Sequence, residues 1–361
     1  MPLKRLSVAV AVSGGVDSLC ALALLKKSGH QVFALHGRFL HGGDWQKLED
    51  LDAVCSRLGV KFYAADLIED FDRLVINPFL AEYQSGLTPN PCARCNKAIK
   101  FGKLLQTARM LGADCIATGH YARLEPWPLE DGQPNWLVAP GWDQAKDQSY
   151  FLSLLEPERK GMVRFPLGGL LKSQCRKIVA ECGLSPPIGK ESQDICFING
   201  RSGDYLAERL GAGAGDICLE EPNGSIRKIG RHQGLWNYTE GQRKGIGIPW
   251  KCSLYVSRKD AAENTLFVRE GKVNLKGVDT GRPVLALPIR LWPEKVYARL
   301  RYRGKLAEAS VRLMTDGMKI MFKEEYPASA PGQIASVTTR DGLILAGGKI
   351  EKLFFSNNLA R

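Results

Sequence analysis

Predicted strands and helices alternate along the first 120 residues, and this alternation constrains the fold more than any other feature of the chain. Short apolar runs occur at Leu6–Val12, Gln31–Leu35, Lys61–Ala65 and Cys115–Thr118. Helices are predicted between and after them, over 19–28, 45–58 (capped by Asp44), 71–85 and 97–111. Strands that alternate with helices form a parallel, doubly wound α/β sheet, so we expect this fold class.

The texture of the sequence changes after about Gly200. Glycine becomes frequent, long helical periodicity is lost and short alternating runs appear, which is typical of small β-rich domains. We therefore expect an α/β domain over 1–202, a small central domain over 203–279 and a β-barrel-like domain over 280–361. From Gly281 to Arg361 there are 14 Lys and Arg against 7 Asp and Glu, so this segment supplies +7 of the net +12. This excess favours a nucleic-acid partner.

Nothing in the sequence indicates a membrane protein. Apolar runs stay well below the ~18 residues that a spanning helix needs, and no signal-peptide core follows the first residues. We therefore expect a cytoplasmic protein, in which cysteines stay reduced. Six cysteines in apolar or helical stretches are predicted to be packing residues: Cys20, Cys55, Cys115, Cys175, Cys182 and Cys252.

A glycine-containing loop connects the first predicted strand to the first helix. It reads Ala11, Val12, Ser13, Gly14, Gly15, Val16, Asp17, Ser18. The carboxyl end of a parallel strand, followed by a helix N-terminus, is where such sheets bind phosphates. The Ser hydroxyls would donate to phosphate, and Asp17 could hold Mg²⁺ or the nucleotide. A Walker loop is excluded because no Lys follows the glycines.

An ordinary tight turn is the alternative interpretation of this loop. However, Ser-Gly-Gly-Val-Asp-Ser directly after a first strand resembles the loop of the ATP pyrophosphatases. These enzymes transfer AMP to a substrate oxygen and release pyrophosphate.

A second feature is the pair Cys92 and Cys95 on a proline-rich segment that enters a helix. A helix N-terminus and the neighbouring cations Arg94 and Lys97 would favour the thiolate, which suits a nucleophile or a metal ligand. A structural zinc half-site is the alternative, but no second half follows downstream. By itself, the apolar run Ile195–Ile198 is predicted to be a strand, in which Cys196 would be a core residue.

Taken together, motifs along nearly the whole chain resemble the tRNA-specific 2-thiouridylase family. Besides the loop they are Asn90-Pro-Cys-x-x-Cys-Asn96, Ala117-Thr-Gly-His-Tyr-Ala122, Lys146-Asp-Gln-Ser-Tyr-Phe-Leu152, Ser192-Gln-Asp-Ile-Cys-Phe197, Gly230-Arg-His-Gln-Gly234, Tyr238-Thr-Glu-Gly-Gln-Arg243 and Ala330-Pro-Gly-Gln333. The resemblance implies an ATP-dependent sulfurtransferase that modifies the wobble uridine of tRNA. It would adenylate the 2-carbonyl oxygen, transfer sulfur, and release AMP and pyrophosphate.

The resemblance also implies roles for individual residues. Residues 11–18 and Gly119 would bind ATP with Mg²⁺; Cys95 would be the nucleophile and Cys196 would hold sulfur as a persulfide. Asn90, Pro91 and Cys92 would surround the flipped base. Seven residues would contact the tRNA anticodon stem-loop: His120, Lys146, Asp147, Gln148, Arg301, Tyr302 and Gln333. An upstream donor, a cysteine desulfurase or sulfur-relay protein, would supply the sulfur. A core histidine at His120 and a solvated pair at Lys146 and Asp147 are the alternatives.

One position departs from the family pattern, and three other interpretations stay open. The family usually has an apolar Met that helps to hold adenine where this chain has Gly37. Cys92, Cys95 and Cys196 could together ligate a [4Fe–4S] cluster that binds sulfide, although the family pattern favours the persulfide. A small-molecule adenylating ligase would share residues 11–18 but would not need the cysteine pair. An RNA-binding protein without catalysis would not need the loop.

Overall fold

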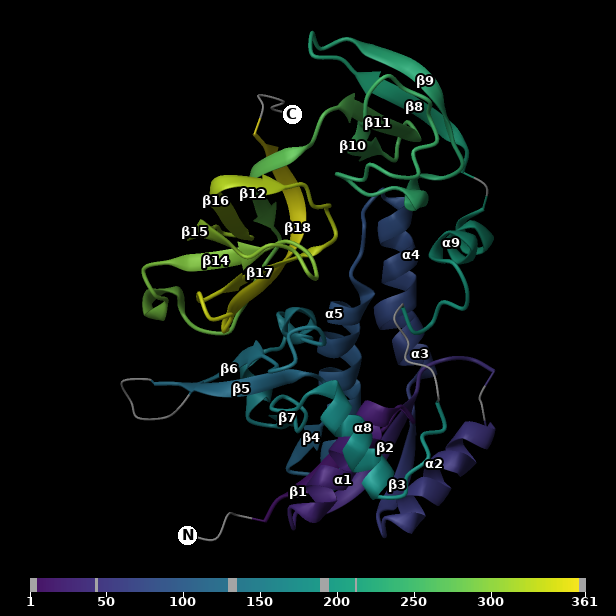
Figure 1. Cartoon of the computed structure of the whole chain (residues 1–361), viewed down its shortest axis with the longest axis vertical. Coiled ribbons are helices and arrows are strands. Elements are labelled where there is room, and N and C mark those ends of the chain that lie inside the picture. Colours follow the sequence, from purple (N-terminus) through teal and green to yellow (C-terminus); the bar gives the residue numbers. More distant parts are fainter. Residues whose placement is uncertain (1–4, 43–44, 129–134, 189–194, 212, 357–361) are drawn as a thin grey trace.

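The computed structural model describes residues 5–42, 45–128, 135–188, 195–211 and 213–356. Its first layer is a five-stranded parallel sheet of order β3-β2-β1-β4-β7 (Figure 1). The strands are β1 (Ser7–Ala11), β2 (Gln31–Arg38), β3 (Lys61–Asp66), β4 (Cys115–Ala117) and β7 (Val163–Arg164). All four predicted strands are present, and the predicted doubly wound α/β class is confirmed.

Helices cover both faces of this sheet, because the strands are apolar on both sides. Val8 and Val10 of β1 pack with α1 (Val16–Lys27), α2 (Trp45–Arg57) and α8 (Lys172–Glu181). Ala9 between them points to the other face. That face is covered by α3 (Ile68–Phe71), η1 (Asp72–Ile76), α4 (Asn77–Gln84), α5 (Pro91–Cys95), η2 (Asn96–Leu104) and α6 (Leu105–Met110). The predicted cap Asp44 lies outside the described residues.

Two of the predicted helices contain π-helical segments. The helix predicted over 97–111 begins earlier, at Pro91, and η2 winds as a π-helix for nine residues. Hydrogen bonds in a π-helix join residues five apart, and such segments are frequent at functional sites. Lys100 lies on η2, five residues beyond Cys95.

Several elements between the sheet strands and the central domain were not predicted. They are the hairpin β5 (Ala122–Trp127) and β6 (Asn135–Pro140), η3 (Ser149–Leu152), α7 (Pro157–Lys160) and α9 (Ser202–Leu210). The hairpin projects from the sheet edge beside the barrel (Figure 1). Ile195–Ile198, predicted as a strand, is instead a turn in which the Ile198 amide donates to the Ile195 carbonyl at 3.0 Å.

The central domain is a four-stranded sheet of order β10-β11-β8-β9. Its elements are β8 (Gly215–Glu220), β9 (Ile226–His232), η4 (Leu235–Asn237), β10 (Leu254–Asp260) and β11 (Thr265–Glu270). It stands at the far end of α4 from the parallel sheet (Figure 1).

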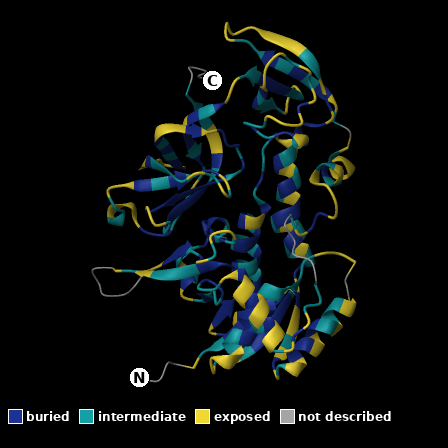
Figure 2. Cartoon of the chain, in the orientation of Figure 1, coloured by how far each residue is buried: buried dark blue, intermediate teal, exposed yellow. Residues whose placement is uncertain are grey.

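The last domain is a β-barrel, as predicted. Its strands run in the order β12-β16-β15-β14-β17-β18, and pairing of β12 with β18 closes it. The elements are β12 (Asn274–Thr280), β13 (Val284–Leu285), η5 (Ile289–Leu291), β14 (Val296–Arg299), β15 (Ala307–Leu313), β16 (Met318–Pro327), β17 (Ile334–Thr338) and β18 (Ile344–Phe355). Buried positions concentrate inside each domain and where the barrel meets the first domain (Figure 2). No helix among the described residues is long and apolar enough to span a membrane.

Candidate nucleotide and thiol site

The loop after β1 has the geometry of a phosphate cradle. Gly14 has φ +92°, a conformation that side chains rarely adopt, and Gly15 is the N-cap of α1. The Ser18 hydroxyl donates to the Gly15 carbonyl at 2.9 Å and accepts from the Ser13 amide at 3.2 Å. Two hydrogen bonds of the Ser18 hydroxyl thus fix the conformation of the loop. The loop lies at the carboxyl end of the central strand, where an open sheet binds ligands.

Asp17 on this loop has two strong partners from distant segments. The Lys172 ammonium at the start of α8 donates to both carboxylate oxygens at 2.8 Å, and the Tyr121 hydroxyl donates to Oδ1 at 2.8 Å. Lys172 is nearly buried, and it provides the cation that the loop itself lacks. Sequence reasoning missed this residue because nothing near Lys172 differs from an ordinary helix start.

At two glycines a side chain would collide with neighbouring atoms. Gly119 lies against the loop after β1, and Gly37 lies against Phe39. A Cβ on Gly119 would lie 2.9 Å from the Asp17 carbonyl carbon, so only glycine allows β4 to approach the loop so closely. At Gly37, a Cβ would lie 2.4 Å from the Phe39 ring. Phe39 thus fills the space beside Gly37, and it stacks on Phe71.

The cysteine helix, formed by α5 and η2 (residues 91–104), carries Arg94 and Lys97, and each of them has a carboxylate partner. Arg94 pairs with Glu82, and Lys97 pairs with Glu156 at 3.5 Å. Both line a cavity of about 460 Å³ between the first domain and the barrel. Neither cation affects the pKa of Cys92, Cys95 or Cys196. The prediction that Arg94 and Lys97 favour the thiolates is therefore wrong, because carboxylates hold both cations.

Lys100 is the cation that acts on all three cysteines. Desolvation raises the pKa of each thiol, for Cys95 to about 12, and the Lys100 ammonium opposes this shift at Cys92, Cys95 and Cys196. A negative charge on Cys196 would raise the pKa of both other cysteines further. Cys95 is 8% exposed, whereas Cys92 and Cys196 are exposed.

His120 follows Gly119 and contacts Lys100 of η2 and Thr118. Its Nε2 lies 3.4 Å from the Lys100 ammonium, and its Nδ1 lies 2.7 Å from the Thr118 hydroxyl oxygen. Burial, followed by the charge of Lys100, lowers the pKa of His120 well below its usual value. The ring is therefore neutral, with Nε2 as acceptor and Nδ1 as donor. Buried in this way, it fits a core histidine better than the tRNA contact predicted for it.

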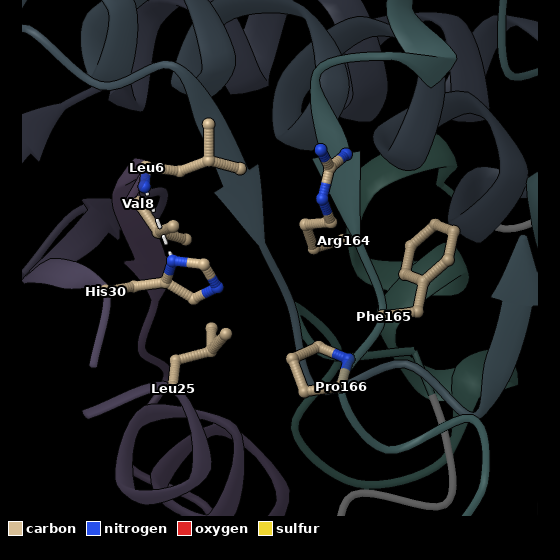
Figure 3. Close-up of a pocket in the computed structure, with 7 residues that line it drawn as sticks. All are labelled: Leu6, Val8, Leu25, His30, Arg164, Phe165 and Pro166. Atoms are coloured by element: carbon tan, nitrogen blue, oxygen red, sulfur yellow. Dashed lines mark hydrogen bonds between the residues drawn. The ribbon is translucent and has the colours of Figure 1, made fainter. Parts of the chain in front are cut away.

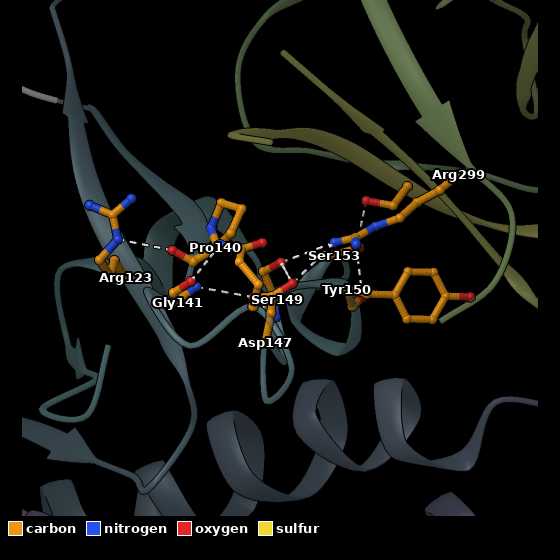
Figure 4. Close-up of polar contacts among 10 residues, drawn as sticks. Arg123, Pro140, Gly141, Asp147, Ser149, Tyr150, Ser153 and Arg299 are labelled. Carbon is orange, nitrogen blue, oxygen red and sulfur yellow. Dashed lines mark hydrogen bonds and ion pairs between the residues drawn. The ribbon is translucent and has the colours of Figure 1, made fainter. Parts of the chain in front are cut away.

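The other residues predicted to contact tRNA divide into buried and exposed ones. Asp147 is buried: its carboxylate accepts from Gly141, from the Ser149 amide and hydroxyl, and pairs with Arg299 of the barrel at 3.7 Å (Figure 4). Gln148 accepts from the Tyr121 amide at 3.0 Å. Lys146 is partly exposed, Arg301 is exposed, and the Tyr302 ring packs at a tilt against Phe151 with centroids 4.5 Å apart.

Gln333 points to the first domain. Its side-chain amide donates to the carbonyls of Thr88 and Pro89, at 2.9 and 3.2 Å, just before Asn90. The Asn90 side chain caps α5 by accepting from the Ala93 amide at 3.1 Å.

Known proteins match this chain along nearly its whole length. Family models match in three consecutive segments: a tRNA methyl transferase HUP domain over residues 6–200, a tRNA methyl transferase PRC-barrel domain over 203–270 and an aminomethyltransferase beta-barrel domain over 290–350. A protein of Oleidesulfovibrio alaskensis called tRNA-specific 2-thiouridylase MnmA is 43% identical over 96% of this chain and 99% of its own. One of the same name from Bacillus licheniformis is 38% identical over 96% and 95%.

The chain belongs to the tRNA-specific 2-thiouridylase family.

Solved structures match this family member only weakly. A predicted tRNA methyltransferase subunit from Methanocaldococcus jannaschii aligns with a TM-score of 0.31 and 14% identity, over 57% of this chain and 86% of its own. NMN synthetase from Francisella tularensis aligns with a TM-score of 0.30 and 16% identity, over 50% and 63%. These scores are too low to support an argument.

Five of the six cysteines predicted to be packing residues are buried or half-buried. Cys20, Cys55, Cys115 and Cys175 are buried as predicted and Cys182 is half-buried, but Cys252 is exposed, so its predicted packing role is wrong. In the described part of the chain, no three or more His, Cys, Asp or Glu residues are grouped as metal ligands would be. Ser192, Gln193 and Asp194 of the Cys196 motif lie outside the described residues.

A second cavity, of about 180 Å³, lies at the other end of the central strand. Leu6, Leu25, His30 and Arg164 are among the residues that line it (Figure 3). It adjoins the beginning of β1, whereas the phosphate loop follows its end, so it is separate from the nucleotide and thiol site.

Proposed function

We propose that this protein thiolates the wobble uridine of tRNA at position 2, using ATP and a sulfur atom held on Cys196. One observation supports this above all: two adjacent residues join the nucleotide loop to the cysteines. Gly119 packs on Asp17 of the loop, and His120 contacts Lys100, whose charge acts on all three thiols. A small-molecule ligase would need the loop but not this connection.

ATP activates the base in the first step. The 2-carbonyl oxygen of the uracil attacks the α-phosphorus, pyrophosphate leaves, and the oxygen becomes part of a good leaving group. The serines of the loop and the Gly14–Gly15 backbone would hold the phosphates. Mg²⁺ is the counterion of this substrate. Phe39, at the end of β2, replaces the apolar side chain that Gly37 lacks and would face the adenine.

Sulfur transfer then uses both cysteines. The terminal sulfur of a Cys196 persulfide attacks C2 and AMP leaves, so that the base is joined to Cys196 through two sulfur atoms. The Cys95 thiolate attacks the Cys196 sulfur, which releases 2-thiouridine and forms a Cys95–Cys196 disulfide. Both electrons for the reduction of the transferred sulfur come from the two thiols. An external thiol must then reduce the disulfide before the next turnover.

The [4Fe–4S] alternative fits the described residues less well. Cys92, Cys95 and Cys196 lie within electrostatic reach of one another, but they are not grouped as metal ligands would be. We therefore propose sulfur transfer through the Cys196 persulfide and not through a [4Fe–4S] cluster. Iron analysis of anaerobically purified protein checks this: about four irons, together with loss of activity in Cys92→Ala, would favour the cluster.

The function is tested on tRNA. Purified protein, loaded with sulfur by a cysteine desulfurase and given ATP and unmodified tRNA, should form 2-thiouridine, detected by nucleoside mass analysis. One AMP and one pyrophosphate should appear per thiouridine. Ser13→Ala should lower both products together by at least about tenfold, because it removes a serine that supports the loop. Thiouridine formed without AMP, or AMP formed without tRNA at the same rate, would contradict the proposal.

A further inference from the structure

Thr88 of the first domain, just before the segment that would hold the target base, is bound by both of the other domains. From the barrel, the Pro331 carbonyl accepts from the Thr88 amide at 2.8 Å. The Gln333 side chain binds the Thr88 and Pro89 carbonyls. From the central domain, the Lys259 ammonium donates to the Thr88 hydroxyl at 3.0 Å. Every polar group of this residue is thus held by a β-domain.

The Lys259 side chain is itself held in a buried setting. It is 1% exposed, donates to the Tyr238 carbonyl at 3.0 Å and lies 3.7 Å from the Glu240 carboxylate. Burial lowers the pKa of Lys259 and raises that of Glu240, and their mutual attraction opposes both shifts. Burying this ion pair costs desolvation free energy. Its contact with Thr88 therefore indicates a role other than stabilising the fold.

Two glycines allow the domains to approach closely enough for these bonds. Gly332 has φ +94°, and a Cβ there would lie 2.8 Å from the Thr88 carbonyl oxygen. Gly241 has φ +81°, and a Cβ there would lie 2.7 Å from Ala328 of the barrel. The motifs Tyr238–Arg243 and Ala330–Gln333 therefore meet at the same place, although they belong to different domains.

We propose that Gln333, Lys259 and Glu240 form an interdomain clamp on Thr88, and that Gln333 is a positioning residue that acts on thiolation through this segment. The inference rests on the proposed function. Asn90, the cap of the cysteine helix, follows Thr88 by two residues, and a rigid Pro91 comes next. A shift at Thr88 therefore moves both the base-binding residues and the start of the helix that holds Cys92 and Cys95.

The clamp predicts a specific response to Gln333→Glu. The new carboxylate keeps the shape of the side chain but faces two carbonyl oxygens, which repel it. Turnover should fall about 100-fold, as expected for a misplacement near 1 Å. The tRNA dissociation constant should stay within about twofold, because the Gln333 amide is engaged by the Thr88 and Pro89 carbonyls. Amide exchange in peptides covering 87–96 should become at least about tenfold faster. Gln106→Glu, an exposed change on α6, is the control and should leave all three unchanged.

A second variant guards against a folding defect. Lys259→Met combined with Glu240→Gln removes both buried charges, and it should also accelerate exchange over 87–96 while tRNA binding is retained. The exchange measurement needs no substrate, so it tests the clamp even if the wild-type protein forms no thiouridine. Tenfold weaker tRNA binding in Gln333→Glu with unchanged exchange would overturn the clamp and make Gln333 a direct RNA contact. Unchanged exchange in both variants would overturn it as well.

Discussion

Cys95 and Cys196 differ in exposure in the way that the proposed reaction requires. Cys196 is exposed, so a donor protein can deliver sulfur to it, whereas Cys95 is almost buried. Burial raises the pKa of Cys95 to about 12, which keeps it protonated at neutral pH. The Cys95 thiol must therefore give up its proton before it can attack the Cys196 sulfur as a thiolate. The order of events is therefore consistent with the different surroundings of the two residues.

Single cysteine substitutions should separate these roles. Cys95→Ala and Cys196→Ala should each reduce thiolation to background, and Cys95→Ala should accumulate a persulfide on Cys196, seen by peptide mass analysis as one added sulfur. Cys218→Ala, on β8 in the central sheet, is the control and should keep full activity. Thiolated tRNA from either active-site variant would show that the assigned roles are wrong.

Three lysines lie on η2, and their partners determine which of them acts on the thiols. Lys97, Lys100 and Lys103 all lie on η2, yet only Lys100 acts on the cysteines. Lys97 pairs with Glu156, and Lys103 pairs with Asp70 at 3.3 Å. The neutral His120 ring accepts from Lys100 and so directs its ammonium.

Removal of this charge should therefore change thiol reactivity. Lys100→Met should raise the pKa of Cys196, because a cation that stabilises the thiolate is lost. Alkylation of Cys196 by iodoacetamide at pH 7.5 should therefore slow, because the thiolate fraction at that pH falls as the pKa rises. Lys100→Arg should largely restore the rate, and Lys103→Met should leave the pH profile of alkylation unshifted. Equal profiles in wild type and Lys100→Met would contradict this role.

Across the whole molecule, buried histidines should determine how stability depends on pH. Burial lowers the pKa of His36, His120 and His232 below the usual 6.5. The unfolded chain then binds protons that the folded chain excludes, so their contribution is complete above pH 6.5 and is lost as pH falls. Each can cost about 1.4 kcal/mol per pH unit below 6.5 until its folded pKa is reached. Glu240, whose pKa is raised, acts in the opposite direction.

Urea unfolding at pH 7.5 and pH 5.5 measures this effect. The wild-type midpoint should be clearly lower at pH 5.5, and His120→Gln should show a smaller difference between the two pH values. Gln106→Ala, an exposed change on α6 that involves no titratable group, should show the wild-type difference. A midpoint that is equal or higher at pH 5.5 would show that these histidines accept protons in the folded state.

Local patterns were sufficient to predict four of the five strands of the parallel sheet, and they drew attention to the loop after β1 and to the cysteine motifs. A strand such as Ser7–Ala11 is recognisable because apolar side chains must cover both faces of a parallel sheet, and Gly14 because its φ requires glycine. Both requirements act within a few residues of chain. The resemblance of the motifs to a known family added the expected roles of Cys95 and Cys196.

Only the tertiary structure determined which partner each polar or charged side chain binds. Lys172 meets Asp17 from 155 residues away, and Gln333 meets Thr88 from 245 residues away. Arg94 and Lys97, adjacent to the cysteines in sequence, are instead held by Glu82 and Glu156. The physical reason is that hydrophobic periodicity records only whether a residue faces the core. A polar side chain is bonded to whichever partner the packing of distant elements brings within about 3 Å.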